Sequence, residues 1–242
     1  MNEFLAFVER FRPGYAATVR GAQESEIRGL ENLAGRAMPA AFRHYLGIAG
    51  HDNGRLPLYG GEADFRFATL VRFCQAPTWK LPPNLVYIAR DGSGLGMDLY
   101  LDTSQSGDDP LVLRMPPAPA PDEVETEFPS FTCMLYFLVF QELGLPVLAH
   151  RAQFRDSGEI PWGTRAPETR LSTLRRTAAM LGFSPVPHTG EWAAAYQRAD
   201  AGITAYEPPK YGPTYSVAAS DAAALSKIEE VLAASLGLLR VG

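Results

Sequence analysis

Apolar residues recur through the first fifty positions at the spacing of amphipathic helices. Residues 2–11 predict a short helix, and a second helix is predicted from residue 23 until Gly35 ends it. A third helix at 40–49 follows Met38-Pro39, because proline is well accommodated in a first helical turn. The positions predicted to be buried on this third helix are Phe42, Tyr45, Leu46 and Ala49.

From residue 56 the apolar positions take the shorter spacing of extended chain. We expect a short extended piece at 56–59, while 69–73 suits either a strand or a helix. Three strands are then predicted, at 85–89, 97–102 and 111–115. The second of them alternates apolar and polar side chains, which is typical of a half-buried antiparallel strand. A hairpin turn is predicted at Asp91-Gly92-Ser93-Gly94.

The second half of the chain alternates proline-rich segments with regular ones. Residues 116–127 predict a proline-rich acidic loop, and Ser130 then caps an apolar helix that runs to Leu143. Glycines and prolines in 151–168 predict a linker. The elements predicted for the tail are a helix at 169–181, strands at 192–198, 201–207 and 214–219, and a helix at 221–236 that Asp221 caps.

Together these elements predict an α+β fold. We expect an antiparallel or mixed sheet flanked by helices in residues 1–150, then the linker at 151–168. Residues 169–242 would form a small α+β extension of two helices and three strands.

Composition agrees with an ordinary globular chain. Hydrophobic residues make up 46% and charged residues 20% of the sequence. The longest apolar run, 131–140, is half of the about 20 residues that cross a bilayer, and the N-terminus does not resemble a secretory signal. We therefore expect a cytoplasmic protein with no membrane association. Its two cysteines, Cys74 and Cys133, suit buried thiols better than a disulfide or zinc site.

Negative charge is concentrated in the middle of the chain. The net charge is −5, and between residues 91 and 127 nine acidic residues face one basic residue, Arg114. Such a field repels nucleic acid and favours a basic protein partner, although a solvated acidic loop has the same composition. The acidic residues that we select as candidate partner contacts are Asp91, Asp98, Asp102, Asp108 and Asp109.

The same aspartates could instead indicate a catalytic or metal site. Asp91, Asp98 and Asp102 lack the spacing and closing Glu of a calcium loop. Asp98 and Asp102 are four residues apart on one strand, hence about 13 Å apart, which is too far for the carboxylate pair of a retaining glycosidase. The four histidines are scattered, and no nucleotide-binding glycine motif is complete. We therefore predict no catalytic residues, no metal and no cofactor.

Tyrosines supply a second kind of candidate contact. The segment 206–213 places Tyr206 and Tyr211 around a stiff proline-rich loop, and stiff aromatic loops lose little entropy on binding. A merely long turn has the same sequence features. Tyr59, in the short extended piece, is the third tyrosine that we select as a candidate contact.

The order of three motifs resembles the SUKH superfamily, which includes fungal regulators of cell-wall synthesis and bacterial immunity proteins. The first runs from Glu24-Ser25-Glu26-Ile27 through Met38-Pro39 to Asn53-Gly54. The second is Tyr87-Ile88-Ala89-Arg90-Asp91-Gly92-Ser93-Gly94, and the third is Pro129-Ser130-Phe131. The likeness covers residues 24–150. The chain departs from the family pattern at Met38, which replaces a leucine, at His51-Asp52, and in the proline-rich loop at 116–128.

The resemblance implies binding rather than catalysis. Bacterial members of the superfamily typically neutralise a polymorphic or type VI-secreted toxin by direct contact. The leading hypothesis is therefore an immunity protein that binds a cognate basic toxin. The alternative is an intracellular regulatory or scaffold module of the cell-wall-regulator type, and a hydrolase that uses the acidic loops ranks third. The sequence leaves the oligomeric state and the role of residues 151–242 open.

Overall fold

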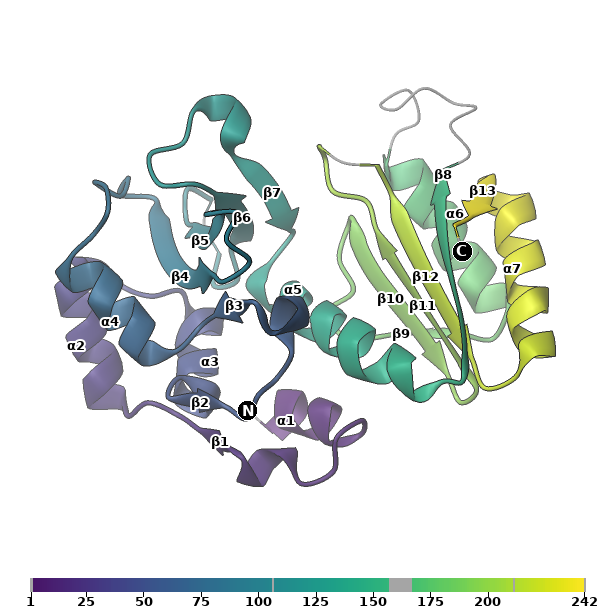
Figure 1. Cartoon of the computed structure of the whole chain (residues 1–242), viewed down its shortest axis with the longest axis horizontal. Coiled ribbons are helices and arrows are strands. Elements are labelled where there is room, and N and C mark those ends of the chain that lie inside the picture. Colours follow the sequence, from purple (N-terminus) through teal and green to yellow (C-terminus); the bar gives the residue numbers. More distant parts are fainter. Residues whose placement is uncertain (1, 106, 157–166, 211, 242) are drawn as a thin grey trace. The chain divides into compact units, whose positions relative to one another are not determined.

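The structure is a computed structural model that describes residues 2–105, 107–156, 167–210 and 212–241. The chain divides into two compact units, Met1–Leu135 and Tyr136–Gly242. The helices of the first unit are α1 (Asn2–Glu9), α2 (Glu24–Ala34), α3 (Ala40–Ala49) and α4 (Phe67–Gln75) (Figure 1). Helix α5 (Phe131–Val139) begins in the first unit and ends in the second, continuing as a π-helical turn at Phe140–Gly144.

Local capping signals account for the predicted helices. At the start of α2 the backbone N–H of Gln23 donates to Glu26 Oε2 at 2.7 Å, and at its end Gly35 adopts a φ of 67°. In α3 all four residues of the predicted stripe are buried. Ser130 Oγ accepts from the Cys133 N–H at 3.1 Å at the start of α5. These helix predictions are confirmed.

The strands of the first unit form an antiparallel sheet in the order β3-β4-β5-β6-β7. Their bounds are β3 (Ala63–Asp64), β4 (Leu85–Asp91), β5 (Asp98–Asp102), β6 (Leu111–Met115) and β7 (Glu125–Phe128). A separate small ladder joins β1 (Val19–Arg20) and β2 (Asp52–Asn53). In β5 the consecutive residues Leu99, Tyr100 and Leu101 are all buried, so the half-buried prediction for this strand is wrong. Both of its faces are covered.

In three further segments of this unit, the structure either decides between two predicted elements or differs from the prediction. The ambiguous segment 69–73 lies within α4. The expected extended piece at 56–59 is instead irregular and enters a 3-10 turn at Leu58–Gly61, where Tyr59 has a φ of 53°. Part of the predicted loop at 116–127 forms β7, which pairs with β6 at the edge of the sheet. An edge strand needs few apolar residues, so this composition did not reveal it.

The second unit is an antiparallel sheet in the order β13-β8-β12-β11-β10-β9 with two helices. The helices are α6 (Pro167–Met180) and α7 (Ala222–Leu236). The strands are β8 (His150–Asp156), β9 (Ser184–Pro185), β10 (Ala193–Arg198), β11 (Ala201–Tyr206), β12 (Thr214–Ala219) and β13 (Leu238–Arg240). The predicted linker was wrong for its first part, because 151–156 belong to β8 and pair with β12 and β13. Residues 157–166 lie outside the described residues.

Both faces of this second sheet are covered. Helices α6 and α7 pack side by side on one face, as Figure 1 shows, with Leu174, Ile228 and Leu232 at most 1% exposed. On the other face, a Cβ placed on Gly202 of β11 would lie 2.6 Å from Leu145 and 2.8 Å from Phe140. This close approach explains the glycine at position 202 of β11. With both units described, the molecule is α+β, as predicted.

Candidate functional site

The loop between β4 and β5 is held in shape by the carboxylate of Asp91. Its Oδ1 accepts from the Ser93 backbone N–H at 3.0 Å and from the Ser93 hydroxyl at 2.6 Å, and its Oδ2 accepts from the Met97 N–H at 3.2 Å. Aspartate commonly stabilises turns in this way. Gly94 and Gly96 supply positive φ angles on either side of Leu95. The loop therefore presents Leu95 in a fixed conformation, with its side chain 72% exposed.

Two carboxylates at this hairpin have pKa values shifted in opposite directions. Burial alone would raise the pKa of Asp91, but hydrogen bonds from Ser93 and Met97 outweigh it and lower the pKa. Asp98 Oδ1 accepts from the Asp91 N–H at 2.8 Å, and burial raises the pKa of Asp98 above its ordinary value. The two acids thus differ in acidity because hydrogen bonds within the loop dominate at Asp91 and burial dominates at Asp98.

Asp91 and Asp98 line a polar pocket of about 470 Å³. Its other charged lining residues are Arg72 of α4 and Arg90 of β4, which are both exposed. Among the ion pairs of the described residues, none within 4.0 Å involves either arginine. The hairpin end therefore carries two acids that are engaged within the loop and two guanidinium groups that are open to a binding partner.

The structure brings together only two of the five selected aspartates. Asp102, at the opposite end of β5, accepts from Asn84 Nδ2 at 3.0 Å and from the Ser104 N–H at 2.9 Å. Asp109 Oδ1 accepts from the Thr132 N–H at 2.9 Å at the start of α5. Asp108 is exposed. Apart from Asp108, the selected aspartates thus stabilise their own loops, strands or helix ends.

The selected tyrosines Tyr59 and Tyr206 belong to different units. The ring of Tyr59 packs edge-on against Phe128 with centroids 6.4 Å apart, and its hydroxyl lies 3.5 Å from Met134 Sδ. In the second unit the Tyr206 ring lies 5.9 Å from that of Phe137. Tyr211 lies outside the described residues.

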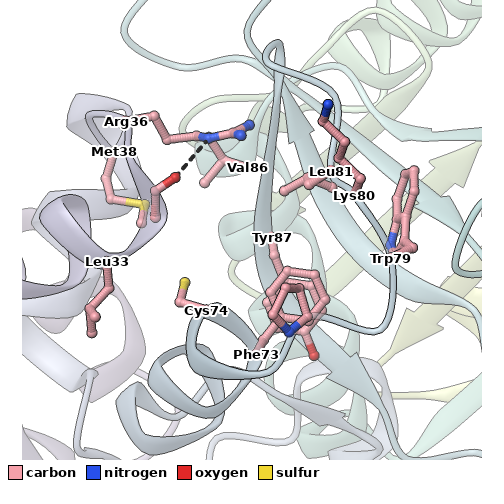
Figure 2. Close-up of a pocket in the computed structure, with 12 residues that line it drawn as sticks. Leu33, Arg36, Met38, Phe73, Cys74, Trp79, Lys80, Leu81, Val86 and Tyr87 are labelled. Atoms are coloured by element: carbon pink, nitrogen blue, oxygen red, sulfur yellow. Dashed lines mark hydrogen bonds between the residues drawn. The ribbon is translucent and has the colours of Figure 1, made fainter.

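An apolar pocket of about 320 Å³ lies next to the polar one, and the sequence did not reveal it (Figure 2). Phe73 of α4 and Tyr87 of β4 line both pockets and stack with centroids 3.8 Å apart and planes 2° apart. The Trp79 indole N–H donates to the Tyr100 hydroxyl at 3.3 Å, which fixes one wall. The other apolar lining residues are Leu33, Ala34, Met38, Pro77, Leu81 and Val86.

Arg36 closes this pocket on the α2 side. Its Nη1 donates to the carbonyl of Pro82 at 2.7 Å and also to that of Leu85, which ties the end of α2 to the start of β4. Burial raises the pKa of the nearby Cys74 thiol, although Arg36 partly offsets the effect. Cys74 is therefore a neutral thiol at physiological pH.

Neither the scan of protein-family models nor the search of curated proteins found a match to this chain.

The described residues also bear on metal binding and membrane insertion. No group of three or more His, Cys, Asp or Glu side chains among them is arranged to hold a metal ion. No helix in the described part of the chain is long and apolar enough to cross a bilayer. The features left as a candidate site are the β4–β5 hairpin and the two pockets behind it.

Proposed function

We propose that this chain is a SUKH-type immunity protein that binds a cognate toxin directly, with the β4–β5 hairpin and the mouth of the polar pocket as its contact surface. The observation that carries the proposal is the loop at 91–98. Asp91 fixes its conformation, and Leu95 stands exposed at its tip. A contact loop that is rigid before binding loses little conformational entropy in the complex.

Charge at the rim supports the same surface. Arg72 and Arg90 line the pocket together with Asp91 and Asp98, and because the two aspartates accept hydrogen bonds within the loop, the two arginines are the charges that remain open to a partner. Arginine is enriched at the energetic centres of protein interfaces, where an apolar anchor and charged neighbours act together. The motif order described above supplies the immunity interpretation, and the hairpin belongs to the second of its three motifs.

The proposal can be tested by identifying a partner and then altering Leu95. Tagged protein is used for affinity capture from its native cells at two salt concentrations, and the captured partner is purified for calorimetry. Leu95→Asp is expected to weaken the complex at least about tenfold, because it places a charge in a desolvated contact. Val147→Asp is the matched control, since Val147 is 66% exposed in the second unit.

Two further readouts decide the immunity interpretation. Asp108→Lys is expected to slow association and reduce its salt dependence if the partner is basic, because Asp108 is an exposed charge in the β5–β6 loop, outside the contact surface, and such charges act through long-range attraction on the association rate. The captured partner is expected to be toxic when expressed alone and harmless when co-expressed with the wild-type chain. Several weak and harmless partners would instead favour the scaffold alternative. Equal binding by Leu95→Asp and the wild type would remove the hairpin from the contact surface.

A further inference from the structure

The apolar pocket separates its charged lining residues from its apolar ones. In Figure 2 the guanidinium of Arg36 and the amine of Lys80 lie towards one end of the view, while Leu33, Cys74 and Phe73 lie towards the other. Leu33 is 50% exposed, so the apolar end stays open to solvent instead of being filled by the protein. A pocket of this kind suits a ligand with one charged end and one apolar end.

The charged end is positive. None of the described lining residues carries a carboxylate, and Arg36 donates to backbone carbonyls only, through Nε and Nη1. Carbonyl oxygens accept hydrogen bonds from the guanidinium but do not neutralise its positive charge. The Nη2 atom of Arg36 has no hydrogen-bond partner among the described residues. Lys80 is exposed at the rim and forms no ion pair with any described residue. An anion entering the pocket would therefore meet two cations with free donors.

Trp79 and Cys74 offer little hydrogen bonding to a ligand. The Trp79 N–H is already donated to Tyr100, and the Cys74 thiol is a weak donor. At about 320 Å³ the pocket is at the small end of the roughly 300–1,000 Å³ range of small-molecule sites. A short ligand fits, and a long-chain lipid does not.

We propose that this pocket binds a small amphipathic carboxylate of the medium-chain fatty-acid class, with the carboxylate towards Arg36 and Lys80 and the chain between Leu33, Phe73 and Trp79. The site needs no protein partner, so it goes beyond the toxin-binding function and can be tested without it.

The test uses the full chain labelled with ¹⁵N and three probes at neutral pH. Octanoate carries both the charge and the chain, octanol has the chain without the charge, and acetate has the charge without the chain. The readout is the indole N–H resonance of Trp79, assigned by its loss in Trp79→Phe. Octanoate is expected to shift this resonance saturably, octanol to bind about tenfold or more weakly, and acetate to leave it unchanged. No saturable shift with octanoate, or equal affinity for octanol, would overturn the proposal.

Two variant pairs separate this site from non-specific binding. Leu33→Trp fills the open end and is expected to abolish octanoate binding, whereas Met180→Trp, at a residue 72% exposed in the second unit, leaves it unchanged. Lys80→Gln is expected to weaken octanoate binding about threefold without affecting octanol, and Lys227→Gln, on the exposed side of α7, is its control. Arg36 is left intact because it also holds the fold. Loss of binding in Met180→Trp, or its retention in Leu33→Trp, would contradict the assignment.

Discussion

Gly21 is one of the glycines at which a side chain would collide with neighbouring backbone. A Cβ there would lie 1.9 Å from the carbonyl oxygen of Gly47 in α3. The residues on either side hold it in place, since the Ala22 N–H donates to Leu46 O at 2.8 Å and the His51 N–H to Arg20 O at 2.9 Å. Neither backbone segment can shift without breaking these hydrogen bonds. The glycine is therefore required by close approach and not by its own conformation.

We expect Gly21→Ala to lower the free energy of unfolding by at least about 2 kcal/mol, as overpacking does in a core. Gly47→Ala is the matched control, because its Cβ would meet nothing within 4 Å and alanine favours a helix interior. This control is expected to raise the free energy of unfolding by about 0.5–1 kcal/mol. Denaturant titration measures the free energy of unfolding of both variants and of the wild type. A neutral Gly21→Ala would mean that β1 and α3 are farther apart than described.

Asp64 makes the stability of the first unit depend on pH. Burial alone would raise its pKa, but hydrogen bonds from the Arg66 guanidinium at 2.9 Å and the Thr69 hydroxyl at 2.7 Å bring the pKa down from 3.8 to about 2. Because the folded value is the lower one, the ionised carboxylate stabilises the fold above pH 3.8, and this contribution is lost as pH falls towards 2.

Asp64→Asn is accordingly expected to cost about 1–2 kcal/mol at pH 7, after allowing for partial solvent screening. The difference from the wild type should shrink between pH 4 and pH 2. Thermal or denaturant unfolding at pH 7, 4 and 2.5 checks this. A difference that stays constant across that range would assign the effect to packing instead of charge.

Among the elements, the β4–β5 hairpin contains two aspartates with opposite roles. Asp98 is half-buried with a raised pKa, so above its unfolded pKa of 3.8 its negative charge costs stability as the pH rises through the folded value. Asp91 uses both of its oxygens as acceptors within the loop.

Asp98→Asn is expected to be neutral or stabilising by up to about 1 kcal/mol at pH 7, because the amide oxygen can still accept from the Asp91 N–H and no charge is buried. Asp91→Asn is expected to destabilise by about 1 kcal/mol, because its amide nitrogen cannot accept from Met97. Unfolding curves and amide exchange of residues 92–97 measure the two effects. The reverse order would contradict the assigned roles.

At the scale of the whole molecule, each unit has its own core, and the core of the second unit includes a buried ion pair. Arg170 of α6 and Glu207 after β11 approach to 3.6 Å with side chains 6% and 1% exposed, and the Tyr215 hydroxyl donates to Glu207 Oε1. The pair links a helix to the sheet beneath it. Removing one member of a buried pair leaves the other charge without this compensation.

Glu207→Leu is expected to destabilise the second unit by about 3–5 kcal/mol. Amide exchange should then accelerate in β10, β11 and β12 while α3 and β5 of the first unit keep their protection. Glu230→Leu on the exposed side of α7 is the control and should change little. Equal loss of protection in both units would show that they unfold as one cooperative body.

The sequence by itself determined the elements that local physics specifies. Gly35, Ser130 and Asp221 mark helix ends through caps that involve only neighbouring residues, and the corresponding helices are where the patterns predict them. The α+β class and three strands of each unit, namely β4, β5 and β6 in the first and β10, β11 and β12 in the second, followed from the same local signals. The candidate aspartates were visible too, but the hydrogen bonds that engage four of them were not.

Tertiary structure decided what depends on residues far apart in the chain. Strands β7 and β8 exist because partners across their sheets supply the hydrogen bonds, and composition gives little sign of such pairing. Tyr59 packs against Phe128, 69 positions away, although its neighbours suggested an extended segment. The apolar pocket joins Arg36, Phe73, Trp79 and Val86 from four separate segments. A cavity is the space left between packed elements, and a one-dimensional pattern does not encode that space.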